Sequence, residues 1–271
     1  MENIEVKEYT QDMVHNLIKG SRKLGSGTSG TVYLVNDEDT WRCVKVGNAD
    51  TSPAELAEEG KVLLHLAGAG GAPILYGKCL DPQALVISYC GSCTFQNLRS
   101  LVKTDHGCIR MILQLAQALA EVHSKMIIHN DLRDENVVIR QGKLGEWPEV
   151  SIIDYGIAKR LGQVTAGIEG ETNSNLPWIA PEMLKYGAVC TRAVDVYSLG
   201  NLIHSTVHRS MKGKYPELER LAEKASSRCP TDRPSLTHII NVLLNLERRT
   251  DPKRNRLPPP GAEYRPSNPE I

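Results

Sequence analysis

Residues 127–139 read IIHNDLRDENVVI and place a dense polar cluster between two apolar runs. Buried polar groups are costly to desolvate, so the cluster predicts a cavity that faces solvent or a ligand. Asp131 and Asn136 lie in this one loop. A carboxylate can accept a proton there, while an amide oxygen can bind a hard cation such as Mg²⁺. The stretch therefore predicts a loop that carries chemistry.

The run from His129 to Asn136 resembles the catalytic loop of eukaryotic protein kinases, whose pattern is H-R-D-L-x-x-x-N. Asn130 stands where that family usually has Arg, so the motif here is HND. The resemblance implies that Asp131 takes the proton of an acceptor hydroxyl, Arg133 steadies the γ-phosphate of ATP and Asn136 binds Mg²⁺. A short match can arise by chance, so the other motifs of the family should follow in order.

Residues 25–30, GSGTSG, form a glycine-rich turn between two strand-like runs. Glycine amides without a neighbouring Cβ can approach phosphate oxygens closely. Dinucleotide-binding folds share this spacing but continue into a helix, whereas a strand follows here. A plain hairpin turn is the alternative to a kinase-type lid over ATP. The resemblance places these residues at the nucleotide: Gly25, Ser26, Gly27, Thr28, Ser29, Gly30 and Val32.

Lys45 lies within an apolar strand, residues 43–46, where a buried ammonium group needs a partner. A solvent-facing lysine on an edge strand is the alternative. Its order after the glycines resembles the kinase strand whose Lys binds the α- and β-phosphates and pairs with a Glu of helix C. Cys43 then occupies the small-residue position against adenine.

Residues 52–66 begin with Ser-Pro in N-cap order and continue with helical period, which predicts helix C. Glu59 shares the apolar face of this helix and is the predicted partner of Lys45, with Glu55 as the competitor. Gly60 weakens a helix by about 1 kcal/mol relative to Ala, so we expect helix C to be mobile.

The remaining motifs also follow the family order. By resemblance, Ile87 and Val138 line the nucleotide pocket, and the hinge that bonds adenine comprises Ser88, Tyr89 and Cys90. Residues 150–156, VSIIDYG, resemble a strand that ends in D-F-G with Tyr for Phe. The resemblance implies that Asp154 binds Mg²⁺ together with Asn136. It also implies an A-P-E anchor whose Glu182 pairs with Arg233, and a helix F that starts near Asp195.

These motifs predict an α+β, two-lobed protein kinase fold, with a small five-stranded antiparallel N-lobe that carries helix C and a mainly helical C-lobe. The interval before the periodic segment 218–225 is short, so helix G of the family should be reduced. The predicted parts are a lead-in (1–20), a kinase domain (21–249) with N-lobe (21–88), hinge (88–91) and C-lobe (92–249), and a disordered Pro-rich tail (250–271).

Composition fits an intracellular globular protein. The chain has 271 residues, 41% hydrophobic and 24% charged, with a formal net charge of +0. This balance gives no reason to expect nucleic acid as a partner. No apolar run reaches the roughly 18 residues that span a bilayer, and the N-terminus lacks a signal-peptide core. Seven scattered cysteines suit free thiols in a reducing compartment, which favours the cytoplasm.

The resemblance implies an ATP- and Mg²⁺-dependent kinase that phosphorylates protein hydroxyl groups. Glu135 before Asn136 favours Ser/Thr specificity, while Trp178 and Arg133 also fit tyrosine or dual-specificity kinases. A pseudokinase that acts as a scaffold is the alternative, suggested by Asn130, Tyr155, Gly60 and the reduced helix G. A small-molecule kinase is disfavoured by the anchor motif. Protein substrates are the implied partners, and Pro258–Pro260 is a candidate ligand for a proline-recognising domain.

Overall fold

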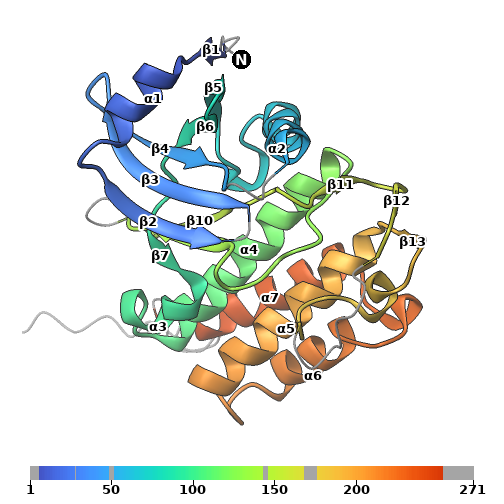
Figure 1. Cartoon of the computed structure of the whole chain (residues 1–271). Helices are drawn as coiled ribbons and strands as arrows, with labels where there is room; N and C mark the ends of the chain where they lie inside the picture. Colours follow the sequence, from blue (N-terminus) through green and yellow to red (C-terminus); the bar gives the residue numbers. More distant parts are fainter. Residues whose placement is uncertain (1–5, 28, 49–51, 143–145, 168–175, 253–271) are drawn as a thin grey trace, which may run out of the picture.

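A small lobe built on a β-sheet lies against a larger helical lobe (Figure 1). The computed structural model describes residues 6–27, 29–48, 52–142, 146–167 and 176–252. The predicted two-lobed α+β fold is therefore confirmed. Thr28, Thr172 and Ser174 lie outside the described residues, as does the chain from residue 253 with its Pro258–Pro260 run.

The small lobe contains a six-stranded sheet, one strand more than predicted. In spatial order its strands are β1 (Lys7–Glu8), β5 (Leu75–Leu80), β6 (Gln83–Ser88), β4 (Thr40–Val46), β3 (Gly30–Asp37) and β2 (Arg22–Gly27). The interior position of β4 between β3 and β6 buries Cys43, Val44 and Lys45. The buried lysine excludes the edge-strand interpretation.

The extra strand comes from the lead-in. β1 pairs with β5 in parallel, whereas the other pairs of the sheet are antiparallel. Helix α1 (Gln11–Ile18) follows and buries Val14, while Tyr9 packs into the same core cluster. A two-residue strand shows no alternation, so the sequence pattern could not reveal it.

Helix α2 (Pro53–Leu66) lies beside the sheet and corresponds to the predicted helix C. The Ser52 side chain accepts a hydrogen bond from the backbone N–H of Glu55, which caps the helix. Gly60 is buried, and a Cβ there would lie 3.3 Å from Leu85 Cδ2. The glycine therefore allows the helix to approach β6 closely.

The large lobe consists mainly of α3 (Leu98–Leu101), α4 (Asp105–Ser124), α5 (Arg192–Ser210), α6 (Pro216–Ala225) and α7 (Leu236–Thr250). Helix α4 is the central element and buries most of its residues against the surrounding core. The periodic segment 95–102 forms the 3-10 turn η2 (Phe95–Asn97) and the short α3 rather than one helix. Residues 211–215 alone join α5 to α6, and no helix lies in them.

Short strands frame the loop between the lobes. β8 (Ile127–Ile128) and β9 (Val137–Arg140) bracket the HND loop. β9 is the middle strand of a small antiparallel sheet, in which β10 (Glu149–Ile152) pairs with one edge of β9 and β7 (Cys93–Thr94) pairs with the other. β11 (Lys159–Arg160) pairs with β8, and β12 (Val164–Thr165) pairs with β13 (Ala188–Val189). Two short strand pairs therefore hold part of residues 157–167.

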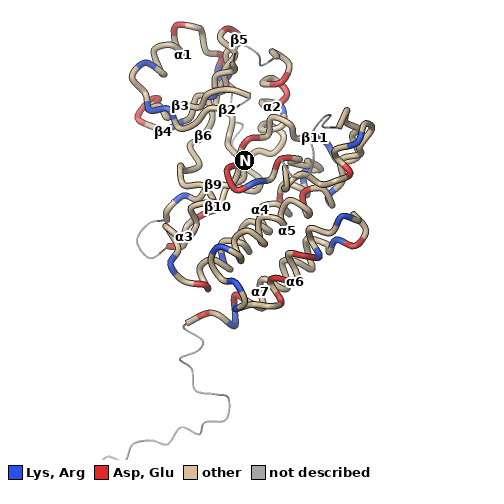
Figure 2. The backbone as a smooth tube through the Cα atoms, turned by 60° about the horizontal axis from the view of Figure 1, so that its bottom comes forward, with Lys and Arg blue, Asp and Glu red and all other residues tan. Residues whose placement is uncertain are grey.

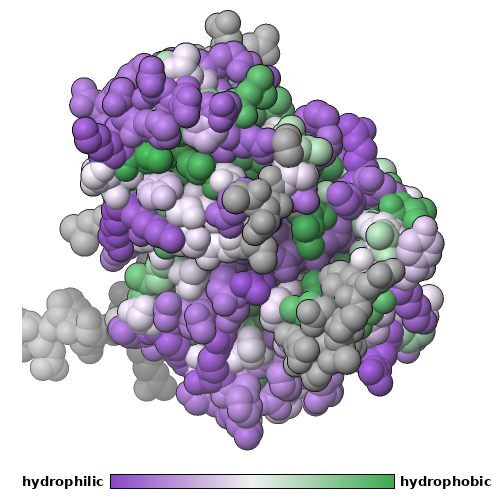
Figure 3. Space-filling view, in the orientation of Figure 1, coloured by the Kyte–Doolittle hydropathy of each residue, from purple (hydrophilic) through white to green (hydrophobic). Residues whose placement is uncertain are grey.

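The surface of the face drawn in Figure 3 is mainly hydrophilic. Lys, Arg, Asp and Glu are interspersed over both lobes in Figure 2. Among the described residues, no helix has the length and apolar character that a membrane crossing requires.

Helices α5 and α6 pack closely at Gly200, which gives a stability prediction. A Cβ at Gly200 would lie 2.6 Å from the Ser226 backbone N and 2.8 Å from Ala225. We expect Gly200→Ala to lower the free energy of unfolding by about 2 kcal/mol, because overpacking outweighs the better helix propensity of Ala. Denaturant unfolding measures this change.

Gly25→Ala is the control, since nothing lies within 4 Å of the added methyl group. A Gly200→Ala variant as stable as the wild type would contradict the close approach of the two helices.

Candidate active site

A cavity of about 480 Å³ lies between the lobes. Predicted residues that line it are Gly25, Ser26, Gly27, Gly30, Val32, Cys43, Lys45, Glu59, Ile87, Ser88, Cys90, Arg133, Asn136, Val138 and Asp154. Ser29 and Tyr89 are not among its lining residues. Leu24 and Ile153 also line the cavity, although the sequence reasoning did not select them. The sequence could have indicated both residues, because Leu24 directly precedes Gly25 and Ile153 directly precedes Asp154.

Gly30 has a conformation that explains its residue type. Its φ of 147° lies in a region that L side chains rarely adopt, and a Cβ there would collide with the Val46 carbonyl oxygen. Gly27 pairs with Gly30 across the β2–β3 hairpin. The glycine-rich turn therefore covers the cavity with backbone rather than with side chains.

Lys45 is shared by two carboxylates. Its Nζ lies 2.7 Å from Glu59 Oε2 and 2.8 Å from Asp154 Oδ1. Burial alone would lower the pKa of this lysine, but the two carboxylates outweigh it and raise the pKa above its usual value. For Asp154, burial would raise the pKa, and Lys45 reverses this effect so that the pKa is lowered. Both groups are therefore charged at neutral pH.

Two N–H donors hold the Asp131 carboxylate, one on each oxygen. Asn136 Nδ2 donates to Oδ2 at 2.8 Å, and Trp178 Nε1 donates to Oδ1 at 2.8 Å. Asn136 Nδ2 also donates to the Asp131 carbonyl at 2.9 Å. The amide oxygen of Asn136 is then the atom that remains for a cation. The contact with Trp178 was not predicted, since the sequence analysis considered that residue only for the class of acceptor.

The buried Asp195 carboxylate binds the backbone of the HND loop. It accepts hydrogen bonds from the backbone N–H groups of His129 at 2.8 Å and Asn130 at 2.9 Å, and from His123 Nε2 at 2.8 Å. Burial would raise the pKa of Asp195, but the bond from His123 and the nearby histidines lower it. Asn130 has φ 65°, a left-handed conformation that Asn tolerates better than most residues.

The side chain of Asn130 links the loop to later segments. Its Nδ2 donates to the Ile157 carbonyl at 3.2 Å and contacts Cys190 Sγ at 3.5 Å. These neutral contacts reach the segment after Asp154 and a residue two positions before α5. The loop is thereby tied to both segments without a charged side chain at this position.

His129 connects the loop with the strand before Asp154. Its Nε2 donates to the Ile153 carbonyl at 3.0 Å, which leaves Nδ1 to accept the Asp131 backbone N–H at 3.2 Å. The ring packs edge-on against Tyr155, with centroids 4.8 Å apart. Tyr155 fills this buried site, but its hydroxyl has no hydrogen-bond partner among the residues that the structure describes.

Arg133 lies at the cavity but turns toward its neighbours. Its guanidinium group lies over the Trp178 ring, 4.8 Å from the centroid. Its Nε is 2.8 Å from Glu135 Oε2, an ion pair in which the N–H is not aligned for a hydrogen bond.

Glu182 and Arg233 form a two-fold contact with N–O distances of 2.6 and 2.8 Å. Arg233 also donates to the carbonyls of Ala193 and Ser227. This planar, bidentate geometry fixes the anchor segment relative to α5.

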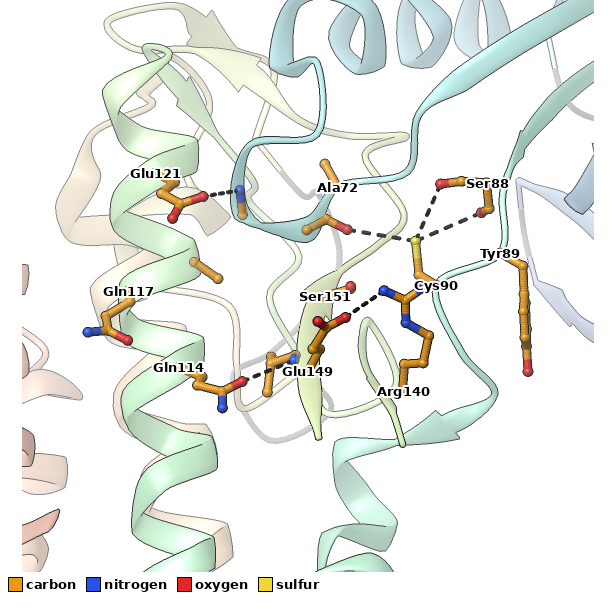
Figure 4. A pocket seen from close by; sticks show the side chains of 14 residues that line it. Ala72, Ser88, Tyr89, Cys90, Gln114, Gln117, Glu121, Arg140, Glu149 and Ser151 are labelled. Atoms are coloured by element: carbon orange, nitrogen blue, oxygen red, sulfur yellow. Dashed lines mark hydrogen bonds and ion pairs between the residues drawn. The ribbon is translucent and has the colours of Figure 1, made fainter. Parts of the chain in front are cut away.

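A second cavity of about 420 Å³ lies behind the hinge (Figure 4). Its polar groups bind one another or the backbone: Glu121 accepts from Gly70 N, Gln114 accepts from Val150 N, and Arg140 pairs with Glu149. Cys90 Sγ points into this cavity, 3.7 Å from the Gly71 carbonyl. Cys90 of the hinge thus contacts the segment behind it through the residues that line this cavity.

The comparisons with known proteins agree with this arrangement. The protein kinase domain family matches residues 18–227. The chain is 31% identical over 242 residues to serine/threonine-protein kinase pkn2 of Myxococcus xanthus, covering 82% of this chain and 28% of that protein. It is 28% identical over 197 residues to serine/threonine-protein kinase KIC1 of Saccharomyces cerevisiae, covering 69% and 18%. Dual specificity protein kinase pyk3 of Dictyostelium discoideum is 23% identical over 253 residues, covering 82% and 18%. The chain thus spans less than a third of the length of these relatives.

The unpartnered hydroxyl of Tyr155 gives a second stability prediction. We expect Tyr155→Phe to raise the free energy of unfolding by about 1 kcal/mol, because the ring is kept and a desolvated hydroxyl is removed. Tyr9→Phe is the matched control, since the Tyr9 hydroxyl donates to Asp37 at 2.8 Å and its loss should destabilise the protein. Thermal unfolding of both variants gives the comparison; a destabilised Tyr155→Phe variant would show that the hydroxyl is satisfied.

Proposed function

The chain belongs to the protein kinase family, and on this premise we propose that it binds ATP with Mg²⁺ between its lobes and phosphorylates serine or threonine hydroxyls of proteins. One observation carries the proposal. Lys45, Asn136 and Asp154 line one cavity, and Asp131 is hydrogen-bonded to Asn136 at its edge. These residues come from both lobes, so the fold brings an ammonium group, a carboxylate with a neighbouring amide and a second carboxylate close together, which supports the proposal.

The cavity suits a nucleotide in shape and polarity. Apolar side chains of Leu24, Val32 and Val138 line the part next to the hinge, where an adenine ring would lie. Backbone groups of residues 88–90 are the proposed partners of its edge. The phosphates would extend under the glycine-rich turn toward Lys45, whose ammonium group is held by Glu59.

The donor set fits Mg²⁺, which prefers oxygen ligands. Asp154 supplies the carboxylate oxygen not bound to Lys45, and Asn136 supplies its amide oxygen. The Asp154 side chain is 39% exposed, so it can reach an ion in the cavity. Bound Mg²⁺ would neutralise phosphate charge during transfer.

Asp131 is the proposed base. It would accept the proton of the acceptor hydroxyl as the oxygen bonds to the γ-phosphorus and the bond to ADP breaks. Because phosphoryl transfer depends mainly on positioning and charge, a carboxylate held on both oxygens suits this role. We propose that Arg133, now stacked on Trp178, contacts the γ-phosphate in the nucleotide complex.

Three of the features that suggested a pseudokinase leave the proposed catalytic groups in place, which supports the kinase proposal. Asn130 keeps its backbone bond to Asp195, and Tyr155 stays buried beside His129. Gly60 does not prevent the pair between Lys45 and Glu59. None of these three departures from the family pattern displaces the proposed catalytic groups.

The acceptor class and the location are further parts of the proposal. Two of the relatives reported above are named serine/threonine kinases and one is named dual specificity. All seven cysteines are free thiols, which supports an intracellular, cytoplasmic location. Proteins are the proposed substrates, and the proposed domain spans residues 21–249.

Loss of either proposed acidic residue should stop phosphate transfer. We expect Asp131→Ala and Asp154→Ala each to lower kcat at least roughly 100-fold, because base and metal ligand are removed. Transfer of labelled phosphate from ATP to a broad peptide array measures this. Asp134→Ala is the control, since this carboxylate of the same loop pairs with Arg209 at 3.2 Å.

Wild-type rates in both variants would show that the assignment is wrong. Binding of protein partners without turnover on any acceptor would favour the scaffold alternative instead.

Asn130 also predicts how activity responds to phosphorylation. In kinases with Arg at this position, a phosphate on the following segment pairs with that Arg, and the neutral Asn130 offers no such charge. We therefore expect phosphatase treatment, or Ala at Thr165, Thr172 or Ser174, to change kcat by less than about twofold. A large loss after phosphatase treatment that the Ala variants reproduce would contradict this.

A further inference from the structure

We infer that Trp178 is a positioning residue for phosphate transfer, with its indole N–H fixing the carboxylate of Asp131. The inference deepens the proposed function and rests on it. It begins with one contact, the hydrogen bond of 2.8 Å from Trp178 Nε1 to Asp131 Oδ1.

The chemistry of indole determines the direction of this contact. Indole is a donor only, so the carboxylate must be the acceptor. Asn136 Nδ2 donates to the other oxygen of Asp131 at 2.8 Å. With one donor on each oxygen, the carboxylate group cannot rotate without losing a bond. Each oxygen still has a lone pair that can receive the acceptor proton.

Trp178 is itself held in place by two other elements. Its carbonyl oxygen accepts a hydrogen bond of 2.7 Å from Ser198, a fully buried residue of α5. Its ring lies under the guanidinium group of Arg133 at 4.8 Å. Through its backbone carbonyl and its indole, Trp178 therefore links helix α5, the HND loop and the segment that leads to Glu182.

Through this link, the anchor segment determines the orientation of the Asp131 carboxylate. The segment reaches Asp131 through Trp178, whereas Asp195 holds only the backbone before it. Backbone support from Asp195 alone leaves the Asp131 side chain free to turn. Trp178 removes that freedom on the side opposite Asn136.

The kinetic test is Trp178→Phe, which keeps an aromatic ring under Arg133 but removes the indole N–H together with part of the two-ring system. We expect kcat to fall about tenfold, the effect of one hydrogen bond to a charged group, with KM for ATP unchanged. Trp147→Phe is the matched control. Trp147 also lies under an arginine, Arg110 at 4.9 Å, but has no contact with the active site, so wild-type kcat is expected.

Equal kcat for Trp178→Phe and Trp147→Phe would overturn the inference. A wild-type protein without any turnover would instead overturn the proposed function. An active wild type with a normal Trp178→Phe variant overturns only the role of Trp178, so the two failures are distinguishable.

A spectroscopic test needs no turnover and detects directly whether the Trp178 indole is hydrogen-bonded to Asp131. The chain has three tryptophans, so ¹⁵N-indole spectra contain three N–H signals that Trp178→Phe and Trp147→Phe assign. We expect Asp131→Ala to move the Trp178 signal upfield, because its acceptor is gone, and to leave those of Trp41 and Trp147 in place. A Trp178 signal that does not move would show that the indole does not bind this carboxylate.

Discussion

The buried carboxylate of Asp195 is the contact on which the active-site loop depends. Asp195 lies in the first turn of α5. Its carboxylate accepts hydrogen bonds from two consecutive backbone N–H groups of that loop and from the His123 side chain. A carboxylate without water must have such donors, and the start of a helix is a favourable place for its charge. Asn130, whose backbone N–H is one of these donors, has a left-handed backbone with φ 65°.

The second constraint crosses between the lobes. Lys45 on β4 contacts Glu59 on α2 and Asp154 from the large lobe, so one buried ammonium group holds three segments. Breaking such a network leaves an unpaired buried charge, which is strongly destabilising. Gly60 contributes indirectly, because the helix can then pack against β6 at the distance that the ion pair needs.

Local patterns predicted much of the fold. Strand-like runs marked β3 and β4, and the Ser52 cap with helical period marked α2. The two-residue β1 and the break between η2 and α3 were missed, since elements this short carry no periodic signal. The order of the motifs also predicted most of the residues that line the cleft. The lining residues that it did not predict are Leu24, Pro73, Gly91, Ser92, Thr94, Glu135 and Ile153.

The sequence by itself determined the family, the candidate chemical groups and their order along the chain. Only the tertiary structure decided how those groups are held. Asp131 and Trp178 are far apart in sequence, as are Lys45 and Asp154, and no local pattern relates a side chain to a partner that distant. Packing of α5 under the HND loop brings the indole of Trp178 to the carboxylate of Asp131. What appeared as a polar cluster in residues 127–139 is therefore a catalytic loop whose geometry is set by contacts from outside it.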